Sequence, residues 1–544
     1  MPALPLRLSL LRIARKDCEH FEKNASPFFG TGENIMSRLE FLDARSAAGL
    51  VHDGDTVAIS GNGAGMISAE AILAALEQRF LETGHPCDLT LVHSLGLGDR
   101  DKLGTNRFAH EGMLRKVIAA HFTWSLKIQQ LIRDEKIEAY CFPGGVIQQL
   151  LREIGAGRPG LFTHSGLGTF VDPRHDGGRC NARSREELVE VMQIDGREIL
   201  RYKPFKVDVA IIRGTYADAR GNISPEEEPI DMDIHTVALA AHNSGGRVLA
   251  QVRQIVEAGT LHPRFVRVPG ILVDAIVQDS AQQQFYGLGY DPSICGARRA
   301  HLPKASAALP DKLERRIIAR RAALEIRNGA SLNFGFGIPG GIFGVIAEQS
   351  NSDSLWMSVE QGVHNGRMLD DALFGAAANP EVILPSIEQF DYYSGGGIDI
   401  TFLGMGETDR FGNVNVSHLA GNLIGPGGFM EIAQNAKKVV FCGTFDAQGS
   451  KVEWSHGRLS VVQPGKIHKF VNDVERITFS GDFARNLGQE VLYITERAVF
   501  RLASDGLDLI EVAPGIEIER DVLPHMEFRP RLSAVGTMPV SVFE

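Results

Sequence analysis

Two pairs of similar segments occur in the same order in the two halves of this chain of 544 residues. Residues 53–65 (DGDTVAISGNGAG) resemble residues 328–341 (NGASLNFGFGIPGG), because each has a polar turn with glycine, a short β-type run and then G-x-G. Residues 207–224 match residues 398–415 without a gap. The residues that coincide in this second pair are Asp208 with Asp399, Asp218 with Asp409, Gly221 with Gly412, and Asn222 with Asn413. Two such pairs in the same order indicate a duplicated fold, with one copy in each half.

Apolar runs alternate with helical stretches along the chain. The pattern predicts strands over residues 55–60, 87–94, 138–142 and 207–212. Residues 68–83 are predicted to form a helix with Ser68 as its N-cap. Continuous apolar strands that alternate with helices are typical of open, mostly parallel sheets covered on both faces. We therefore expect an α/β protein with two related domains, and ligands at the carboxyl ends of the strands.

The domain boundaries follow from composition. Residues 1–35 are basic and apolar at first, and we expect this extension to lie outside the fold. Residues 36–298 would form the first domain and residues 317–544 the second. Between them, residues 299–316 hold two prolines among alanine, serine and lysine, which indicates a linker.

Charge and cysteine usage narrow the class of protein. The net charge of −11 argues against a surface for nucleic acid or an anionic membrane, which would show a basic excess. No apolar run approaches the ~20 residues of a membrane span. The six cysteines are scattered without a C-x-x-C pair, so a reducing, cytoplasmic compartment is expected.

A carboxylate follows an apolar run in the second half. The segment WMSVEQGVHNG (356–366) contains Glu360 directly after the run 355–359, with Gly362 and Gly366 behind it. If this run is a strand of a parallel sheet, Glu360 lies at the edge where ligands bind. The carboxylate could bind a ribose, hold a metal, act as a base or attack a substrate.

The first alternative is a dinucleotide site. Gly335, Gly337 and Gly340 form a literal G-x-G-x-x-G after a predicted strand, and Glu360 lies twenty residues after the last of them. This arrangement resembles a dinucleotide-binding fingerprint with its ribose-binding acid, and it would make the protein a nicotinamide-dependent oxidoreductase. The histidines and cysteines show no H-x-x-x-H or C-x-x-C spacing, so no metal site is predicted.

The second alternative is a nucleophilic glutamate. A carboxylate can attack an activated carbonyl and form an acyl anhydride, provided that substrate approaches closely and donors stabilise the oxyanion. Glycine permits the close approach, and backbone N–H groups of glycine-rich turns supply donors. The sequence offers such turns at 335–341, 394–399 and 424–430.

Several motifs resemble family I CoA-transferases with fused α and β halves, similar to 3-oxoacid CoA-transferases. SVEQGVHNG resembles the catalytic SENG-type, or E-x-G, motif of that family. Residues 163–178, 319–339 and 423–445 are similar to three further motifs of the family and occur in the family's order. Gln361 replaces the asparagine of SENG, and the first-half glycine loop reads SGNGAG. With these two differences, the sequence most resembles the fused acetate, propionate and short-acyl members of the family.

The resemblance implies a CoA-transferase fold with the active site at the interface of the two domains. It implies ping-pong transfer of CoA from a short-chain acyl-CoA to acetate or a similar acid through a glutamyl-CoA thioester on Glu360. A hydrolase using the same glutamate remains an alternative. CoA is then a substrate, no cofactor is required, and a homo-oligomer is expected. The implied site residues are Gly428 and Phe429 as oxyanion donors, Gly335, Phe336, Gly337, Ile338 and Pro339 on the CoA side, and Gln361, Gly362 and Gly427 as further substrate-binding positions.

Overall fold

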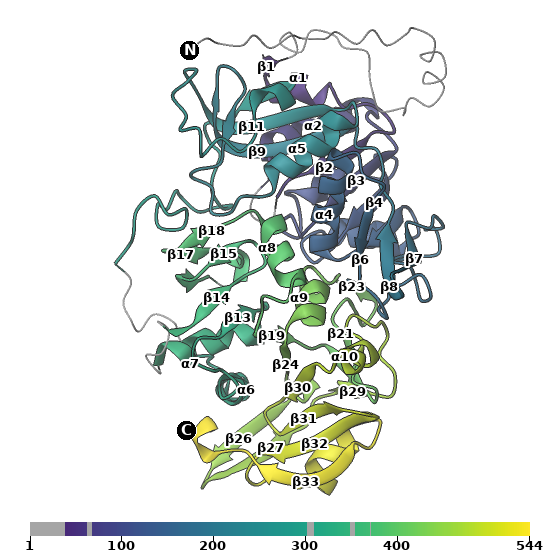
Figure 1. The fold of residues 1–544 in the computed structure, drawn as a ribbon, viewed down its shortest axis with the longest axis vertical. Helices are drawn as coiled ribbons and strands as arrows, with labels where there is room; N and C mark the ends of the chain where they lie inside the picture. The colour runs from purple at the N-terminus through teal and green to yellow at the C-terminus, as the bar shows by residue number, and fades with distance from the viewer. Residues whose placement is uncertain (1–38, 62–67, 302–308, 349–353, 370) are drawn as a thin grey trace, which may run out of the picture.

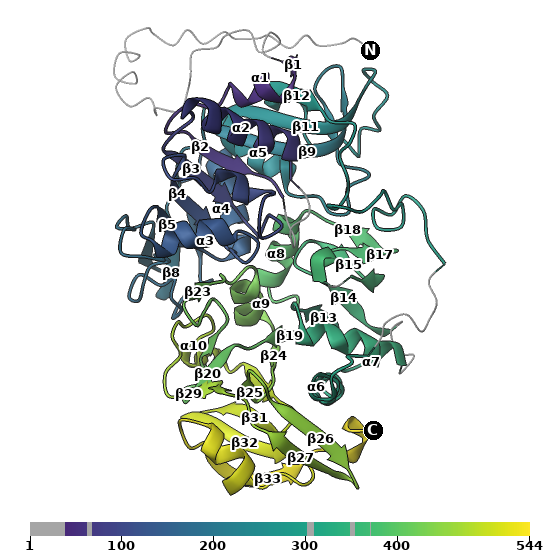
Figure 2. The same ribbon diagram turned by 180° about the vertical axis from the view of Figure 1, so that it is seen from behind.

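The computed structural model describes residues 39–61, 68–301, 309–348, 354–369 and 371–544. The predicted N-terminal extension 1–35 lies outside the described residues, as do most of the first-half glycine loop and part of the predicted linker. Figure 1 shows the first half above the second, with the chain running from purple to yellow. Figure 2 shows the same arrangement from behind.

The first half is built on a nine-stranded sheet in which all pairs are parallel except that of β10 with β9. In spatial order its strands are β1 (Glu40–Leu42), β12 (Ala275–Gln278), β11 (Arg247–Val256), β9 (Val209–Asp218), β2 (Thr56–Ile59), β3 (Leu89–His93), β4 (Leu114–Ala119) and β5 (Glu138–Cys141), with β10 (Ile223–Ser224) beside β9. Its helices are α1 (Ala44–Ala48), α2 (Glu70–Thr83), α3 (Leu126–Arg133), α4 (Gly144–Gly155) and α5 (Ile234–Asn243). The four strands predicted in this half are thus confirmed.

The second half contains a ten-stranded sheet with a parallel centre and antiparallel pairs toward both edges. In spatial order its strands are β18 (Val382–Ile383), β15 (Val363–His364), β14 (Trp356–Ser358), β13 (Ser331–Phe334), β19 (Ile400–Gly404), β24 (Lys438–Cys442), β30 (Glu490–Ile494), β31 (Ala498–Ala503), β32 (Gly506–Val512) and β33 (Arg531–Thr537). Its helices are α6 (Leu313–Ala323), α7 (Ile342–Glu348), α8 (Ser386–Ser394), α9 (Phe429–Asn435) and α10 (Gly481–Leu487). The end of the predicted linker 299–316 is therefore helical, because α6 begins inside it.

Smaller sheets complete the fold. They consist of β6 (Leu161–Thr163), β8 (Arg197–Tyr202) and β7 (Val189–Ile194); β21 (Val414–Asn415), β20 (Glu407–Asp409) and β29 (Phe470–Val471); β26 (Lys451–Ser455) and β27 (Arg458–Gln463); β16 (Arg367–Met368) and β17 (Ala377–Ala378); β22 (His418–Leu419) and β23 (Asn422–Leu423); and β25 (Asp446–Ala447) and β28 (Ile467–His468).

The duplication seen in the sequence is present in the fold. In the first half β2 pairs in parallel with β9, and in the second half β13 pairs in parallel with β19. An aspartate holds each pair in the same way: Asp208 Oδ2 accepts the N–H of Thr56 at 3.0 Å, and Asp399 Oδ2 accepts the N–H of Ser331 at 2.9 Å.

The turns that follow these strands also repeat. Asp218 Oδ1 accepts the backbone N–H of Asn222 at 3.0 Å, and Asp409 Oδ1 accepts that of Asn413 at 2.9 Å. In each turn the asparagine side chain returns a hydrogen bond of 2.9 Å to the other carboxylate oxygen. The aligned residues are therefore structural, because they close the same Asx-type turn twice.

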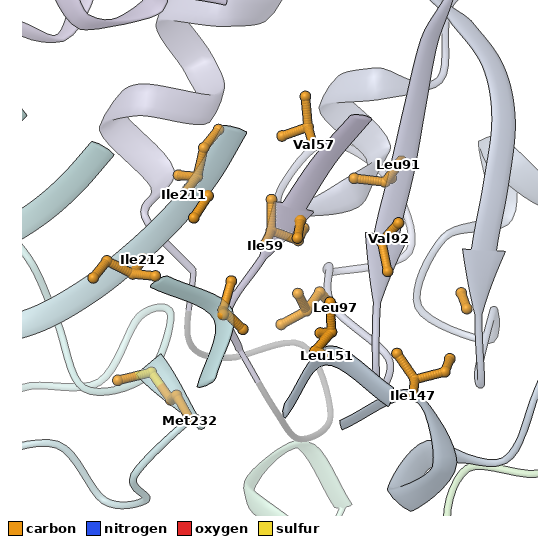
Figure 3. Packing of buried hydrophobic residues seen from close by; sticks show 14 of the residues in the cluster. Val57, Ile59, Leu91, Val92, Leu97, Ile147, Leu151, Ile211, Ile212 and Met232 are labelled. Carbon is orange, nitrogen blue, oxygen red and sulfur yellow. The ribbon is translucent and has the colours of Figure 1, made fainter. Parts of the chain in front are cut away.

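Burial follows the apolar strands. The strands of the first sheet pack with α4 in one continuous core. Figure 3 shows members of this core, among them Val57, Ile59, Leu91, Val92, Ile211 and Ile212 on the strands and Ile147 and Leu151 on α4. A second core lies around β13, β19, β24 and β30.

The start of α2 differs from the prediction. Its N-cap is Ala69, which makes no side-chain capping bond. The Ser68 hydroxyl instead bonds to the hydroxyl of Tyr286 and the carboxylate of Glu70. A distant tyrosine thus competes with the helix end for this side chain.

Among the described residues, no helix has both the length and the apolar character that crossing a membrane requires.

Candidate active site

Glu360 lies directly after the strand β14, as predicted. A tight turn follows, in which the Gly362 N–H donates to the Val359 carbonyl at 3.0 Å. Gly362 has a φ of +88°, and a methyl group on it would come within 2.1 Å of the Leu384 carbonyl oxygen. Only glycine fits such a turn. The turn therefore fixes Glu360 at the carboxyl end of a central strand.

Both oxygens of the Glu360 carboxylate are hydrogen bonded. Oε2 accepts the backbone N–H of Gly428 at 3.0 Å, and Oε1 accepts the side-chain amide of Gln361 at 3.2 Å. The Gln361 side chain lies against Gly375, where a methyl group would overlap it at 2.6 Å. The other amide atom, Gln361 Oε1, is buried and has no partner among the described residues.

Glu360 opens into a cavity of about 350 Å³ between the two halves. From the first half, its lining consists of Leu95, Gly96, Arg100, His121, Thr123 and Trp124; from the second half, of Asn333, Phe334, Gly335, Phe336, Glu360, Gln361, Phe374, Leu403, Gly404, Val416, Ile424, Gly425, Pro426, Gly427, Phe429 and Ile432. The first-half residues follow the carboxyl ends of β3 and β4. The cavity thus joins the functional edges of both sheets.

Burial controls the charge in this cavity. It raises the pKa of Glu360 from 4.5 to about 7, against the lowering effect of the Gly428 and Gln361 hydrogen bonds. Burial also lowers the pKa of His121 to about 4, so this imidazole is neutral at physiological pH. Arg100 is exposed and lies over the Trp124 ring at 4.4 Å. Among the described lining residues, Glu360 and Arg100 are the charged ones.

The loop that carries Gly428 is held by the first half. The Phe122 N–H donates to the Ile424 carbonyl at 2.8 Å, and the Gly427 N–H donates to the Ala120 carbonyl at 3.0 Å. At the start of α4, the Gly144 N–H donates to the Gly427 carbonyl at 2.7 Å. The loop whose Gly428 N–H donates to Glu360 is therefore bonded to the first half both after β4 and at the start of α4.

Most of the predicted site residues meet at this cavity. Gly335, Phe336, Glu360, Gln361, Gly427 and Phe429 line it, and Gly428 bonds to Glu360. Gly337, Ile338 and Pro339 are not among the lining residues, because the chain turns there into a 3₁₀ segment, Ile338–Gly341. Gly362 serves the turn described above.

The structure differs from the prediction for the second oxyanion donor. The Phe429 N–H donates to the Pro426 carbonyl at 3.0 Å and is therefore engaged in the turn before α9. Gly428 supplies the amide that reaches Glu360, and the Phe429 side chain contributes to the cavity wall.

Sequence reasoning missed the wall from the first half. Leu95 follows the predicted strand 87–94, and His121 and Trp124 follow β4, a strand that was not predicted. Their position after parallel strands is the signal that could have found them. Phe374, which stacks edge-on with Phe336 at 5.5 Å, lies in irregular chain and carries no such signal.

One group of mixed metal-ligand side chains occurs elsewhere among the described residues. Asp53, His85 and Cys87 place ligand atoms within 4.8 Å of one another. Asp53 Oδ2 bonds to His85 Nδ1 at 2.8 Å, and its Oδ1 accepts the Cys87 N–H at 2.9 Å. These residues precede β2 and β3, so they lie at the edge of the sheet opposite the cavity. No metal is predicted at Glu360.

Comparison with known proteins agrees with this geometry. The sequence model for coenzyme A transferase matches residues 41–279. The chain is 39% identical to acetate CoA-transferase YdiF of Escherichia coli (strain K12), over 92% of this chain and 94% of that protein. It is 42% identical to caffeate CoA-transferase of Acetobacterium woodii, over 91% of this chain and 95% of that protein.

A solved structure is similar over nearly the whole fold. A thioester complex with CoA of the acyl-CoA transferase YdiF from E. coli O157:H7 superimposes with a TM-score of 0.89 at 38% identity, covering 94% of this chain and 98% of that one. The enzyme is therefore a transferase and not the nicotinamide-dependent oxidoreductase that the G-x-G-x-x-G pattern suggested. This chain belongs to the coenzyme A transferase family, as a fused family I enzyme.

Proposed function

We propose that this enzyme transfers CoA between a short-chain acyl-CoA and a free carboxylic acid by a ping-pong reaction, with Glu360 as the nucleophile. The observation that carries this proposal is the position of the Glu360 carboxylate. It lies in a largely apolar cavity, and a backbone N–H from Gly428 is directed at one of its oxygens at 3.0 Å. A fixed carboxylate, a preorganised donor and low exposure to water are the conditions that acyl transfer to a carboxylate requires.

In the first half-reaction, a Glu360 oxygen attacks the thioester carbonyl carbon of the acyl-CoA. The new C–O bond forms, the C–S bond breaks, and CoA leaves as its thiolate. The product is an acyl-glutamyl anhydride. The thiolate then attacks the Glu360 carbonyl carbon, which forms the glutamyl-CoA thioester and releases the first acid as its carboxylate.

In the second half-reaction, another carboxylate attacks the glutamyl-CoA carbonyl and the same steps run in reverse. Protons are neither gained nor lost, because carboxylate and thiolate exchange places. CoA enters as a substrate, and the proposed steps need no metal or further cofactor. Water must be kept from the anhydride, and the apolar wall of Leu95, Trp124 and Ile432 suits that task.

The Gly428 N–H is suited to stabilise charge on Glu360. In each tetrahedral intermediate at the glutamyl carbon, one former carboxylate oxygen carries the negative charge. Oε2 already accepts the Gly428 N–H, so the donor is in place before reaction. On the other side of the cavity, Gly335 and the half-exposed Phe336 are suited to contact the pantetheine arm of CoA.

The relatives support the choice of substrate class. Acetate CoA-transferase and caffeate CoA-transferase are both named for monocarboxylic acids, and the solved relative is a thioester complex with CoA. Acetate and an aromatic acid differ greatly in size. The relatives therefore support CoA transfer to a monocarboxylic acid without singling out one acid.

The test is to add acetyl-CoA alone, treat the protein with borohydride and map the peptides by mass. Borohydride reduces a glutamyl-CoA thioester to an alcohol, so the peptide containing Glu360 should change mass. Glu360→Gln is the matched control and should show no change. An unmodified Glu360 peptide after treatment with several short acyl-CoAs would overturn the mechanism. Steady release of free CoA without an added acid would instead indicate the hydrolase that uses the same glutamate.

A further inference from the structure

A second carboxyl group is buried beside the cavity. Glu431, three residues after Gly428 in the first turn of α9, has no exposed surface. Its Oε1 accepts the backbone N–H of Val146 at 2.7 Å, across the junction of the two halves. Its Oε2 is buried and has no hydrogen-bond partner among the described residues. The proposed reaction assigns this residue no task, although burying a carboxyl group is costly.

Glu431 caps a helix of the other half. Val146 lies in the first turn of α4, whose N-cap, Pro143, makes no side-chain capping bond. The first backbone N–H groups of a helix lack partners within the helix, and an acceptor there is stabilising. Glu431 supplies that acceptor from α9. Figures 1 and 2 show α4, α8 and α9 together at the junction of the two halves.

The same helix end touches the loop that carries the proposed oxyanion donor. The Gly144 N–H donates to the Gly427 carbonyl at 2.7 Å, and Gly427 immediately precedes Gly428. The N-terminus of α4 is therefore attached at two points on either side of Gly428, to Gly427 in the loop and to Glu431 in α9. A shift of α4 relative to α9 would move the peptide that contacts Glu360.

Phe390 of α8 fills the space between these groups. A methyl group on Gly145 would overlap the Phe390 ring at 2.4 Å and approach Glu431 Oε1 at 2.9 Å. A methyl group on Gly428 would overlap the same ring at 2.6 Å and Glu360 Oε2 at 2.3 Å. The Phe390 ring thus packs against both glycines.

We propose that Glu431 is a positioning residue for CoA transfer: its carboxyl joins α4 to α9 and thereby sets the Gly428 N–H against Glu360. This inference rests on the proposed role of Glu360 as nucleophile. Glu431 touches neither the cavity nor the reacting atoms, so it acts through Gly428.

At neutral pH the Glu431 carboxyl is mainly protonated, because its pKa lies above 7. Burial raises its pKa to about 8, and the charge of Glu360 contributes to the rise. The groups that face it are Glu360, the phenol of Tyr202, the amides at the start of α4 and the Phe390 ring. The first turn of α4 has no acidic residue. A neutral carboxyl keeps its acceptor for Val146 and adds no second negative charge beside the nucleophile.

The test compares three substitutions by steady-state kinetics and by the single-turnover rate of glutamyl-CoA formation. Glu431→Gln keeps a neutral acceptor of the same length and should retain kcat within about twofold. Glu431→Ala and Glu431→Asp cannot reach Val146 and should lower kcat by about tenfold or more, with KM for acyl-CoA little changed. Glu431→Asp also serves if Glu431→Ala does not fold.

Glu496→Gln is the matched control, because Glu496 is a buried glutamate that accepts a backbone N–H, that of Phe445 at 2.9 Å, outside the site. It should change thermal stability without changing kcat. A pH profile of kcat/KM gives a second readout. In Glu431→Gln, kcat/KM should fall at low pH with the same apparent pKa as in the wild type.

Three outcomes would overturn the inference. The first is a folded Glu431→Ala enzyme with wild-type kcat, and the second is a Glu431→Gln enzyme as slow as Glu431→Ala. The third is a fall in kcat/KM at low pH that shifts down by a full pH unit in Glu431→Gln, which would show that Glu431 is ionised in the wild type. If the borohydride experiment finds no adduct on Glu360 in the wild-type enzyme, the proposed function fails. That result is independent of the Glu431 variants.

Discussion

The backbone nitrogen of Gly428 lies 3.0 Å from Oε2 of Glu360, although the two residues are 68 positions apart in the chain. The contact exists because the turn after β14 and the turn before α9 lie at the same edge of one sheet. In each turn a glycine occupies a place that a side chain would block. Several measurable consequences depend on this single contact.

Removing the carboxylate should abolish transfer. We expect Glu360→Gln and Glu360→Ala to lower kcat by about 10³-fold or more, because no other carboxylate among the described lining residues can form the anhydride. Circular dichroism and gel filtration should show folded protein, since within the described part of the chain Glu360 makes two hydrogen bonds. A purified Glu360→Ala enzyme with full activity would contradict the mechanism.

Substituting Gly428 should displace the nucleophile. A methyl group here would lie 2.3 Å from Glu360 Oε2, so Gly428→Ala must move either the carboxylate or the donor peptide. We expect kcat to fall by roughly 10²- to 10³-fold, the cost of one lost oxyanion donor. Gly289→Ala is the control, because its methyl group would meet no described atom within 4 Å. Equal activity of the two variants would remove Gly428 from the site.

The rate should depend on pH through Glu360. The attacking species is the carboxylate, and burial raises its pKa to about 7. Below that pH, kcat/KM should fall about tenfold per pH unit, and above it the rate should level off until Glu431, whose pKa burial raises to about 8, ionises in turn. The measurement is a profile of kcat/KM from pH 5.5 to 8.5. A flat profile through pH 6 would show that the carboxylate is ionised well below 7.

Stability should respond to pH in the opposite sense. Because the folded pKa of Glu360 lies above its unfolded value of 4.5, its favourable contribution is complete below about 4.5 and is lost as pH rises through 7. Glu360→Gln lacks this dependence. It should be more stable than the wild type at pH 8 by roughly 1–3 kcal/mol, and the two should converge near pH 4.5. Urea unfolding at both pH values measures the difference.

The cavity should favour acids with a single carboxylate. The wall residue His121 is neutral because burial lowers its pKa to about 4, and Arg100 lies at an exposed position on Trp124. A second carboxylate would lose its hydration without an inward cation. We expect kcat/KM for succinate to be about tenfold or more below that for butyrate, with acetyl-CoA as donor. Equal values would show that Arg100 reaches the distal carboxylate.

Sequence reasoning predicted the architecture and placed Glu360 at the end of a strand, because both depend on local pattern. An apolar run followed by Glu360 and glycine fixes a strand end, and the duplicated aspartate turns mark equivalent places in both sheets. It misassigned Ser68, whose hydroxyl bonds to Tyr286 across more than two hundred residues. The family resemblance implied the Phe429 amide as an oxyanion donor, and in the structure this N–H donates to the Pro426 carbonyl within a local turn. The Ser68 error concerns competition for one polar group, which a tertiary contact decides.

The first-half wall and Glu431 lay beyond such reasoning for a related reason. His121 and Trp124 follow a strand that was not predicted, and their role appears only when the halves meet. In the sequence alone, nothing distinguishes Glu431 from other polar residues of a helix. Its significance comes from Val146, a partner 285 positions away.

The docking of the 424–428 loop on the first half has a consequence for how the enzyme matures. Phe122, Ala120 and Gly144 each bond to this loop, so its shape is completed by residues that are synthesised long before it. Without the first half, the second half would lack both the core packing of Val359 and Val363 beside Glu360 and the backbone bonds that position Gly428. Catalytic competence should therefore arise at the last step of folding, when the halves associate. Recovery of activity during refolding would then report that association and lag behind the return of secondary structure.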